Sequence, residues 1–100
     1  MKREFWRALR VAEPFTASYI YEILLEISKG PKRFVDLKEA CPNEKTRSKR
    51  LKELLRKQLI KAVVLEDPFN RPRIFYVLTE KGDRVLSALR KLREVCVEKG

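Results

Sequence analysis

The chain has 100 residues, the size of a single domain, and 44% of them are hydrophobic while 38% are charged. Lysines and arginines outnumber acidic residues by 24 to 14, and the net charge of +10 favours a polyanionic partner such as nucleic acid or an anionic membrane surface. Because no apolar run approaches the ~20 residues needed to cross a bilayer, we expect a cytoplasmic protein with no membrane partner.

The first two elements are predicted to be helices. Residues 2–12 form the first, with three apolar side chains at helical spacing: Phe5, Trp6 and Leu9. Pro14 ends this helix, and Thr16 caps the second one. The second helix carries four apolar residues on one face: Ile20, Ile23, Leu24 and Ile27. Gly30 and Pro31 then provide a stop signal.

A short helix and a longer basic helix are predicted next, separated by Pro42. The short helix has an apolar side made of Phe34, Leu37, Ala40 and Cys41. Asn43 follows Pro42 directly and offers an N-cap for helix 43–58. Two helices joined by so tight a turn must cross at a steep angle, which is the helix-turn-helix arrangement.

Helix 43–58 is predicted to bury one face and to expose a basic one. The buried side consists of Leu51, Leu54 and Leu55. At about 100° per residue, the opposite side consists of Lys45, Thr46, Lys49, Arg50, Glu53 and Arg56. Of the 13 residues from Lys45 to Lys57, seven are basic and only Glu53 is acidic. A solvated helix face usually mixes both signs, so this composition indicates a surface for a polyanion.

The remaining elements are a hairpin and a final helix. Residues 59–66 and 73–78 are rich in β-branched and aromatic side chains, and turn-forming residues separate them. Thr79 caps a last helix, 80–98, whose apolar stripe comprises Val85, Leu86, Leu89, Leu92 and Cys96. The predicted fold class is therefore mainly α with a small β-hairpin (α+β), in the order α-α-α-α-β-β-α.

The sequence offers little for catalysis or metal binding. It contains no histidine, and Cys41 and Cys96 are too few and too far apart for a zinc site. We also find no glycine-rich phosphate loop and no nucleophile–base pair in it. We therefore expect that the protein is not an enzyme and that it binds no cofactor or metal. Both cysteines are expected to be buried apolar residues. An intersubunit bridge or a redox role stays open for Cys96.

Four segments together resemble the winged helix-turn-helix transcription regulators of bacteria and archaea, the HxlR type most of all, with the MarR and PadR types as relatives. They are Gly30 to Phe34 with Leu37, Arg50 to Leu54, Leu59-Ile60, and Tyr76 to Gly82. The resemblance covers residues 16–90, and Gln58 stands where such regulators usually have a glycine before the wing strand. It implies a winged helix-turn-helix fold in which helix 43–58 enters the major groove of double-stranded DNA.

The resemblance and the charge together imply three groups of DNA contacts. Base edges are expected to meet Lys45, Thr46, Lys49 and Arg50, with Arg47 at the boundary of the buried face. Lys32 and Arg33 are placed for phosphates. The minor groove is expected to meet Asn70, Arg71 and Arg73. An ordinary solvated surface is the alternative, although residues 29–61 hold 12 basic residues against 4 acids.

The chain is expected to be one domain, with a core over residues 16–80 and terminal helices 2–12 and 80–98 that form a homodimer. The expected dimer interface consists of Phe5, Trp6, Leu9, Leu86, Leu89, Leu92 and Cys96. Such a dimer would place two recognition helices ~34 Å apart on a palindromic site. The alternative is that both terminal helices fold back onto their own core.

The function expected from this reading is that of a sequence-specific, homodimeric repressor. Two alternatives from other classes stay open, a winged-helix protein-interaction module and an architectural nucleoprotein module. The sequence offers no support for a small-molecule effector. Its three amide residues, beside abundant Lys, Arg and Glu, are typical of a thermophilic or archaeal protein.

Overall fold

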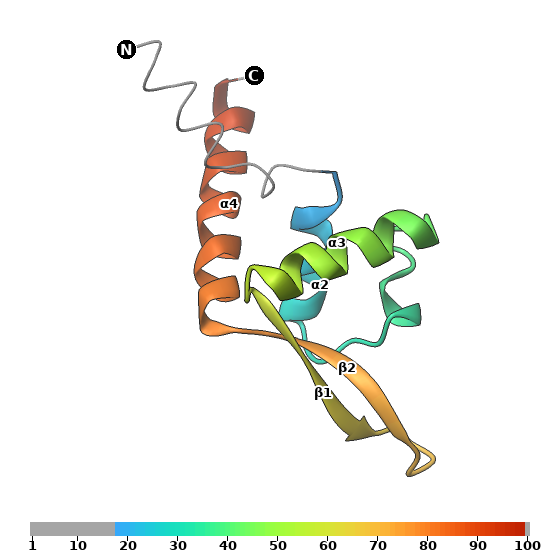
Figure 1. The fold of residues 1–100 in the computed structure, drawn as a ribbon. Coiled ribbons are helices and arrows are strands. Elements are labelled where there is room, and N and C mark those ends of the chain that lie inside the picture. The colour runs from blue at the N-terminus through green and yellow to red at the C-terminus, as the bar shows by residue number, and fades with distance from the viewer. Residues whose placement is uncertain (1–17, 100) are drawn as a thin grey trace.

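The computed structural model describes residues 18–99, with side chains described as far as residue 95. Its elements follow the expected order (Figure 1): α2 Ile20–Ser28, the 3₁₀ turn η1 Val35–Leu37, α3 Glu44–Arg56, β1 Ile60–Glu66, β2 Pro72–Leu78 and α4 Glu80–Lys99. The predicted α+β fold, a winged helix-turn-helix, is confirmed. The expected helix 2–12 and the Thr16 cap lie outside the described residues.

Helix α2 supplies the centre of the core. Its buried residues are those that the spacing predicted: Ile20, Ile23, Leu24 and Ile27. The helix begins at Ile20 because Tyr19 has a left-handed backbone, with φ of 70°. The Tyr19 carbonyl still accepts a hydrogen bond from the Ile23 amide at 2.9 Å, so the first turn is closed.

The predicted short helix before Pro42 is a single 3₁₀ turn followed by irregular backbone. Three consecutive i to i+3 hydrogen bonds hold this turn, the last from the Lys38 amide to the Val35 carbonyl at 3.3 Å. Leu37 and Cys41 are nevertheless fully buried, as their apolar character predicted. The segment thus serves as the first helix of the helix-turn-helix although it is shorter than expected.

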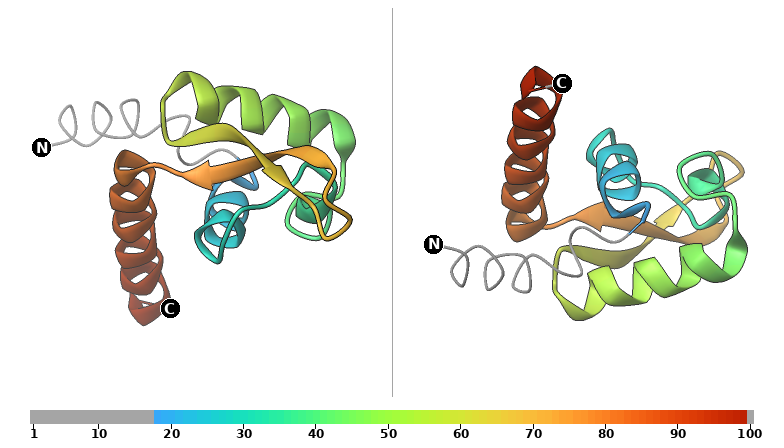
Figure 2. Two further views of the ribbon diagram at one scale, coloured as in Figure 1. Left: turned by 90° about the horizontal axis from the view of Figure 1, so that it is seen from below. Right: turned by 90° about the horizontal axis from the view of Figure 1, so that it is seen from above.

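The wing, residues 60–78, is an antiparallel hairpin that pairs Ile60 with Leu78 and Glu66 with Pro72. Lys32 forms an isolated antiparallel bridge to β2, since its amide and carbonyl both bond to the backbone of Tyr76, at 3.0 and 2.7 Å. The base of the hairpin is buried through Ile60, and the far end extends away from the helices (Figures 1 and 2).

Helix α4 is capped by Thr79, whose hydroxyl accepts from the Gly82 amide at 3.0 Å and donates to the Gln58 carbonyl at 2.7 Å. Leu86 lies in the core rather than on the dimer surface proposed for it, because α4 packs on α2 at this level. Leu89 also packs against the core, whereas Leu92 is 52% exposed. The C-terminal half of α4 projects from the body of the fold (Figure 2).

Gly82 allows α4 to begin against the start of the wing. A Cβ atom at this position would overlap with the carbonyl oxygen of Leu59, which is backbone and cannot turn away. That carbonyl also accepts from the Thr79 amide at 3.0 Å, which fixes its position. The close approach of the two backbones therefore requires glycine here.

We expect Gly82→Ala to lower the free energy of unfolding by about 3 kcal/mol, because the added methyl group forces α4 away from β1. Urea denaturation followed by circular dichroism measures this loss. Ser87→Ala, at an exposed position of the same helix, is the matched control and should change stability little. Equal stabilities for the two variants would contradict the close approach.

Candidate nucleic-acid interface

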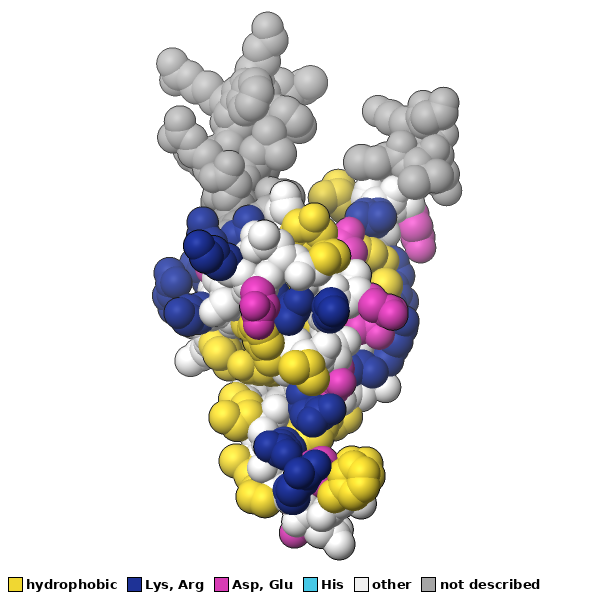
Figure 3. Space-filling model, turned by 90° about the vertical axis from the view of Figure 1, so that its right-hand side faces the viewer, with side chains coloured by type: hydrophobic (Ala, Val, Ile, Leu, Met, Phe, Trp, Pro, Cys, Tyr) yellow, Lys and Arg dark blue, Asp and Glu magenta, His cyan; other side chains and the backbone are white. Residues whose placement is uncertain are grey.

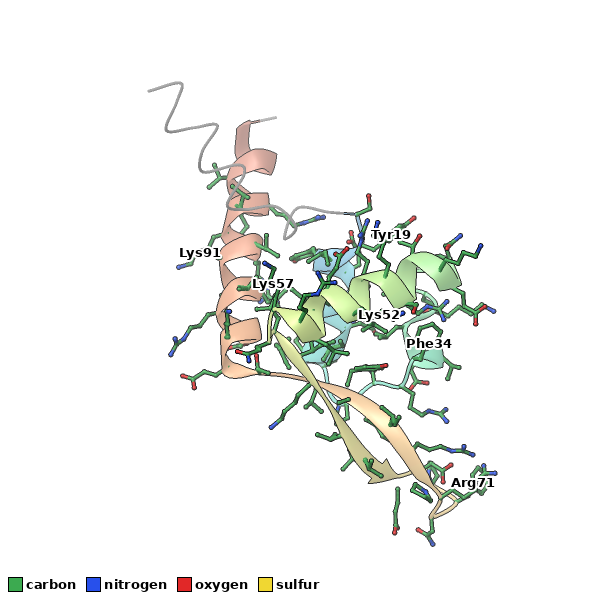
Figure 4. All side chains as sticks on the ribbon, in the orientation of Figure 1. Tyr19, Phe34, Lys52, Lys57, Arg71 and Lys91 are labelled. Carbon is green, nitrogen blue, oxygen red and sulfur yellow. The ribbon has the colours of Figure 1, made fainter. Side chains whose placement is uncertain are left out.

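One exposed face of α3 carries four basic side chains, here called the basic stripe: Lys45, Lys49, Lys52 and Arg56. Steps of four, three and four residues keep them within an arc of about 60° on a helix, over a length of ~16 Å. Lys52 is labelled in Figure 4. The sequence reading left Lys52 out of the interface, although its position seven residues after Lys45 places both on one face.

The basic stripe has little acidic compensation on its own helix. Glu53 is the one acid between Lys45 and Lys57, and both of its carboxylate oxygens accept from Arg50, at 3.1 and 3.4 Å. Glu44 lies in the first turn of α3, where it complements the positive end of the helix dipole. The stripe therefore presents an almost purely positive surface.

Arg50 does not face outward toward a base edge, contrary to the sequence prediction. Its side chain is 16% exposed, and its Nε donates to the Ser18 carbonyl at 2.9 Å while Nη1 bonds to Glu53. These contacts tie α3 to the residues before α2. The expected contact of Arg50 with a base edge is therefore corrected to a structural role.

Arg47 is also structural, and its predicted place among the DNA contacts is wrong. The residue is 4% exposed. Its Nε donates to the Cys41 carbonyl at 2.8 Å, Nη2 to Pro42 at 3.1 Å and Nη1 to Phe34 at 3.5 Å. The guanidinium carbon lies 4.7 Å from the centre of the Phe34 ring. Arg47 thus joins η1, the turn and α3 from inside.

The other residues expected near DNA before the wing have mixed positions. Lys49 and Lys45 are exposed on the basic stripe, and Thr46 is half-buried with its amide bonded to the Asn43 side chain at 2.9 Å. Lys32 is held to β2 by its backbone. Arg33 pairs with Asp36, with Nε 3.5 Å from a carboxylate oxygen, which lowers its availability for phosphate.

Asp67 organises the wing turn, residues 67–71, and was not singled out from the sequence. One carboxylate oxygen accepts from the Phe69 and Arg71 amides, each at 2.9 Å. The other accepts from Nε of Arg71 at 3.3 Å and of Arg73 at 3.2 Å. The hydrogen bond from the Arg71 backbone, helped by Arg73, holds the pKa of Asp67 below its ordinary value. An aspartate opening a turn that contains proline is the signal that could have found it.

Two of the three expected wing contacts therefore share one buried carboxylate. Arg71 and Arg73 remain partly exposed, and Figure 4 shows Arg71 at the far end of the hairpin. Asn70 is exposed with φ of 62°, a left-handed conformation that asparagine tolerates. In Figure 3, basic and hydrophobic side chains lie side by side over the hairpin, which extends downward in that view.

Residues 18–99 offer little support for a reactive cysteine, a metal site or a membrane span. Cys41 is buried as expected, and its burial raises the pKa of the thiol, so it is a poor nucleophile. The side chain of Cys96 lies outside the described ones, as do Phe5, Trp6 and Leu9. Within the described part of the chain, no group of metal-ligating side chains gathers, and no helix is long and apolar enough to cross a membrane.

Comparison with known proteins places this fold among regulators. The model of the HxlR-like helix-turn-helix family matches residues 17–99. The reduced form of the transcriptional regulator YodB from B. subtilis is 30% identical, with 72% of this chain and 71% of that one covered and a TM-score of 0.61. The diamide-treated form of YodB is 26% identical over 83% and 82% of the chains, with a TM-score of 0.70. No curated protein matches the chain.

Two further solved structures show how widely the fold is shared. A PadR-like transcription factor from Bacteroides fragilis is 29% identical over 79% of this chain and 82% of that one, with a TM-score of 0.63. A regulator of the MarR family from Enterococcus faecalis reaches a TM-score of 0.74 at 22% identity, over 94% and 89% of the chains, and supports the fold alone. The resemblance read from the sequence is confirmed.

We expect Arg47→Ala to lower the free energy of unfolding by about 3 kcal/mol, because it leaves the Cys41 and Pro42 carbonyls without the donor that Arg47 supplies. Thermal and urea unfolding measure this. Lys45→Ala removes an exposed charge two residues away and should leave stability nearly unchanged. An Arg47→Ala protein as stable as the Lys45→Ala protein would show that Arg47 faces solvent.

The depressed pKa of Asp67 makes the wing turn sensitive to acid. The carboxylate contributes its full stabilisation above the pKa of the unfolded chain, about 3.9, and loses it as the pH falls through the lower folded pKa. We expect the amide resonances of Phe69 and Arg71 to shift together with a midpoint below pH ~3.9. Asp67→Asn should abolish this titration. A midpoint above the ordinary value would contradict the hydrogen bonding described.

Proposed function

The chain belongs to the HxlR-like helix-turn-helix family, and on that basis we propose that it is a DNA-binding transcriptional regulator of the cytoplasm. The observation that carries the proposal is the basic stripe, because α3 is the second helix of the helix-turn-helix. In this arrangement the second helix enters the major groove and its N-terminal residues meet base edges. Solved regulators with 25–30% identity to this chain support the same function.

The stripe divides by position into two roles. Lys45 and Lys49 lie in the N-terminal half of α3 and are assigned to bases or the phosphates beside them. Lys52 and Arg56 lie toward the C-terminal end and are assigned to the DNA backbone. Arg50 and Arg47 act indirectly, since their bonds to the turn and to Ser18 hold the helix that presents the stripe.

The wing is the second contact that we propose. Asn70, Arg71 and Arg73 approach the minor groove next to the major groove that α3 fills, and Asp67 positions the two arginines. Arg71 retains a side chain that is more than half exposed, so it can still reach a phosphate or a groove edge while bonded to Asp67.

We assign dimerisation to the terminal helices. Leu92 and Val95 lie on the part of α4 that extends past the core and are each more than half exposed. Two such helices, with segment 2–12, would bury these side chains between two copies. The resulting dimer would bind a palindromic promoter site and repress by occluding it, with half-sites ~34 Å apart.

Selection of bound sequences from a random DNA pool tests this function. We expect a palindromic consensus with half-sites about 10 base pairs apart, bound with a steep fall of log K against log salt. No enrichment of any sequence would contradict a specific regulator, and enrichment of single half-sites by a monomer would contradict the dimer.

The double substitution Lys49→Ala/Lys52→Ala should weaken binding to the selected site at least tenfold and reduce the salt slope by about 1.8, since each lost phosphate contact removes about 0.9. The matched control is Arg90→Ala/Lys91→Ala, which removes the same charge from exposed positions of α4. Fluorescence anisotropy at several salt concentrations measures both. Equal losses of affinity in the two variants would mean that DNA binding depends on the net charge of the protein and not on the position of the basic stripe.

A further inference from the structure

Phe69 stands exposed at the tip of the wing. Its relative exposure of 76% is the highest among the large hydrophobic side chains that the structure describes. A single exposed apolar side chain is common on protein surfaces, so exposure alone assigns nothing. Phe69 differs because of how the backbone beneath it is held and which side chain lies beside it.

The wing turn is closed by hydrogen bonds that leave its backbone little freedom. The Asp67 amide donates to the Arg71 carbonyl at 2.9 Å, and the Asn70 amide donates to the Asp67 carbonyl at 2.8 Å. The Phe69 amide itself donates to the Asp67 carboxylate at 2.9 Å. The ring is therefore presented outward by a fixed turn, so little conformational entropy is lost when it binds a partner.

The side chains of the tip place a cation beside an apolar ring and suit a partner that has both phosphates and apolar surface. The Arg71 guanidinium carbon lies 5.2 Å from the centre of the Phe69 ring, so a cation and an aromatic face form one surface. Glu66 and Asp67 balance Arg71 and Arg73 in formal charge. Attraction to phosphate alone therefore cannot be the main contribution of this tip. A duplex offers both properties, with phosphates at the groove edge and stacked bases within.

The length of the wing suits the neighbouring groove. Strands of 7 residues extend ~23 Å. The minor groove lies about half a helical turn from the major groove, or ~17 Å along the axis. A hairpin that starts at the C-terminal end of α3 is therefore long enough for its tip to reach the minor groove while the basic stripe stays in the major groove.

We propose that Phe69 is an apolar wedge that inserts at a base step of the minor groove, with Arg71 on the adjacent phosphate. Aromatic side chains that enter the minor groove unstack a step and bend the duplex. The inference rests on the proposed function and adds to it a residue that makes specificity depend on how easily one step is deformed. Flexible pyrimidine–purine steps are favoured at that position.

The test uses duplexes of the selected sequence with 2-aminopurine placed at one position at a time, since this base brightens when it is unstacked. The wild-type protein should brighten it at one step in each half-site, outside the bases that α3 covers. Phe69→Ala should abolish the brightening and weaken binding about tenfold. Phe69→Leu should retain part of both. Val64→Ala, an exposed apolar position on the same hairpin, is the matched control and should change neither.

Two results would overturn the wedge while leaving the DNA-binding function intact. The first is Phe69→Ala binding within twofold of wild type with the same brightening. The second is a loss of affinity with no step brightened by the wild type, which would mean that Phe69 contacts only the groove edge or a protein. Failure of the wild-type protein to select any sequence would instead refute the proposed function itself.

Discussion

The buried guanidinium of Arg47 is the interaction on which the rest of the structure depends. One side chain donates to the carbonyls of Phe34, Cys41 and Pro42, which lie before η1 and in the turn between η1 and α3. The guanidinium group of an arginine has five N–H donors in one plane. A single Arg47 side chain can therefore bond to all three carbonyls at once. The orientation of α3 relative to η1 follows from this bridge.

A second charge acts in the same way at the other end of the molecule. The Asp67 carboxylate accepts hydrogen bonds from two amides and two guanidinium groups at the wing turn. Arg47 likewise donates to several carbonyls near the turn before α3. Both residues are almost fully buried. Arg47 is used for contacts inside the protein, and Arg71 and Arg73 are partly used to bond to Asp67. Fewer basic side chains are therefore free to bind a polyanion than the net charge of +10 suggests. The basic stripe is the main exposed concentration of that charge on α3.

Local patterns in the sequence predicted much of the fold. The apolar spacing of α2, the cap from Asn43 to Thr46 and the cap from Thr79 to Gly82 all depend on neighbours in the chain, and all are confirmed. Arg47 and Arg50 were misplaced because their partners, such as Ser18 at 32 residues' distance, cannot be read from helical projection. Gln58, at the position where the resemblance implies a glycine, adopts φ of 61°, which lies in the left-handed region that glycine favours.

The central claim is that the basic stripe of α3 lies in the major groove of specific DNA. Methylation of guanine N7, an atom exposed only in that groove, tests it most directly on the selected duplex. We predict that methylation at guanines within each half-site prevents binding by the wild-type protein and that binding in turn protects those guanines. Binding that is indifferent to N7 methylation throughout the site, while the affinity stays high, would contradict the placement of α3.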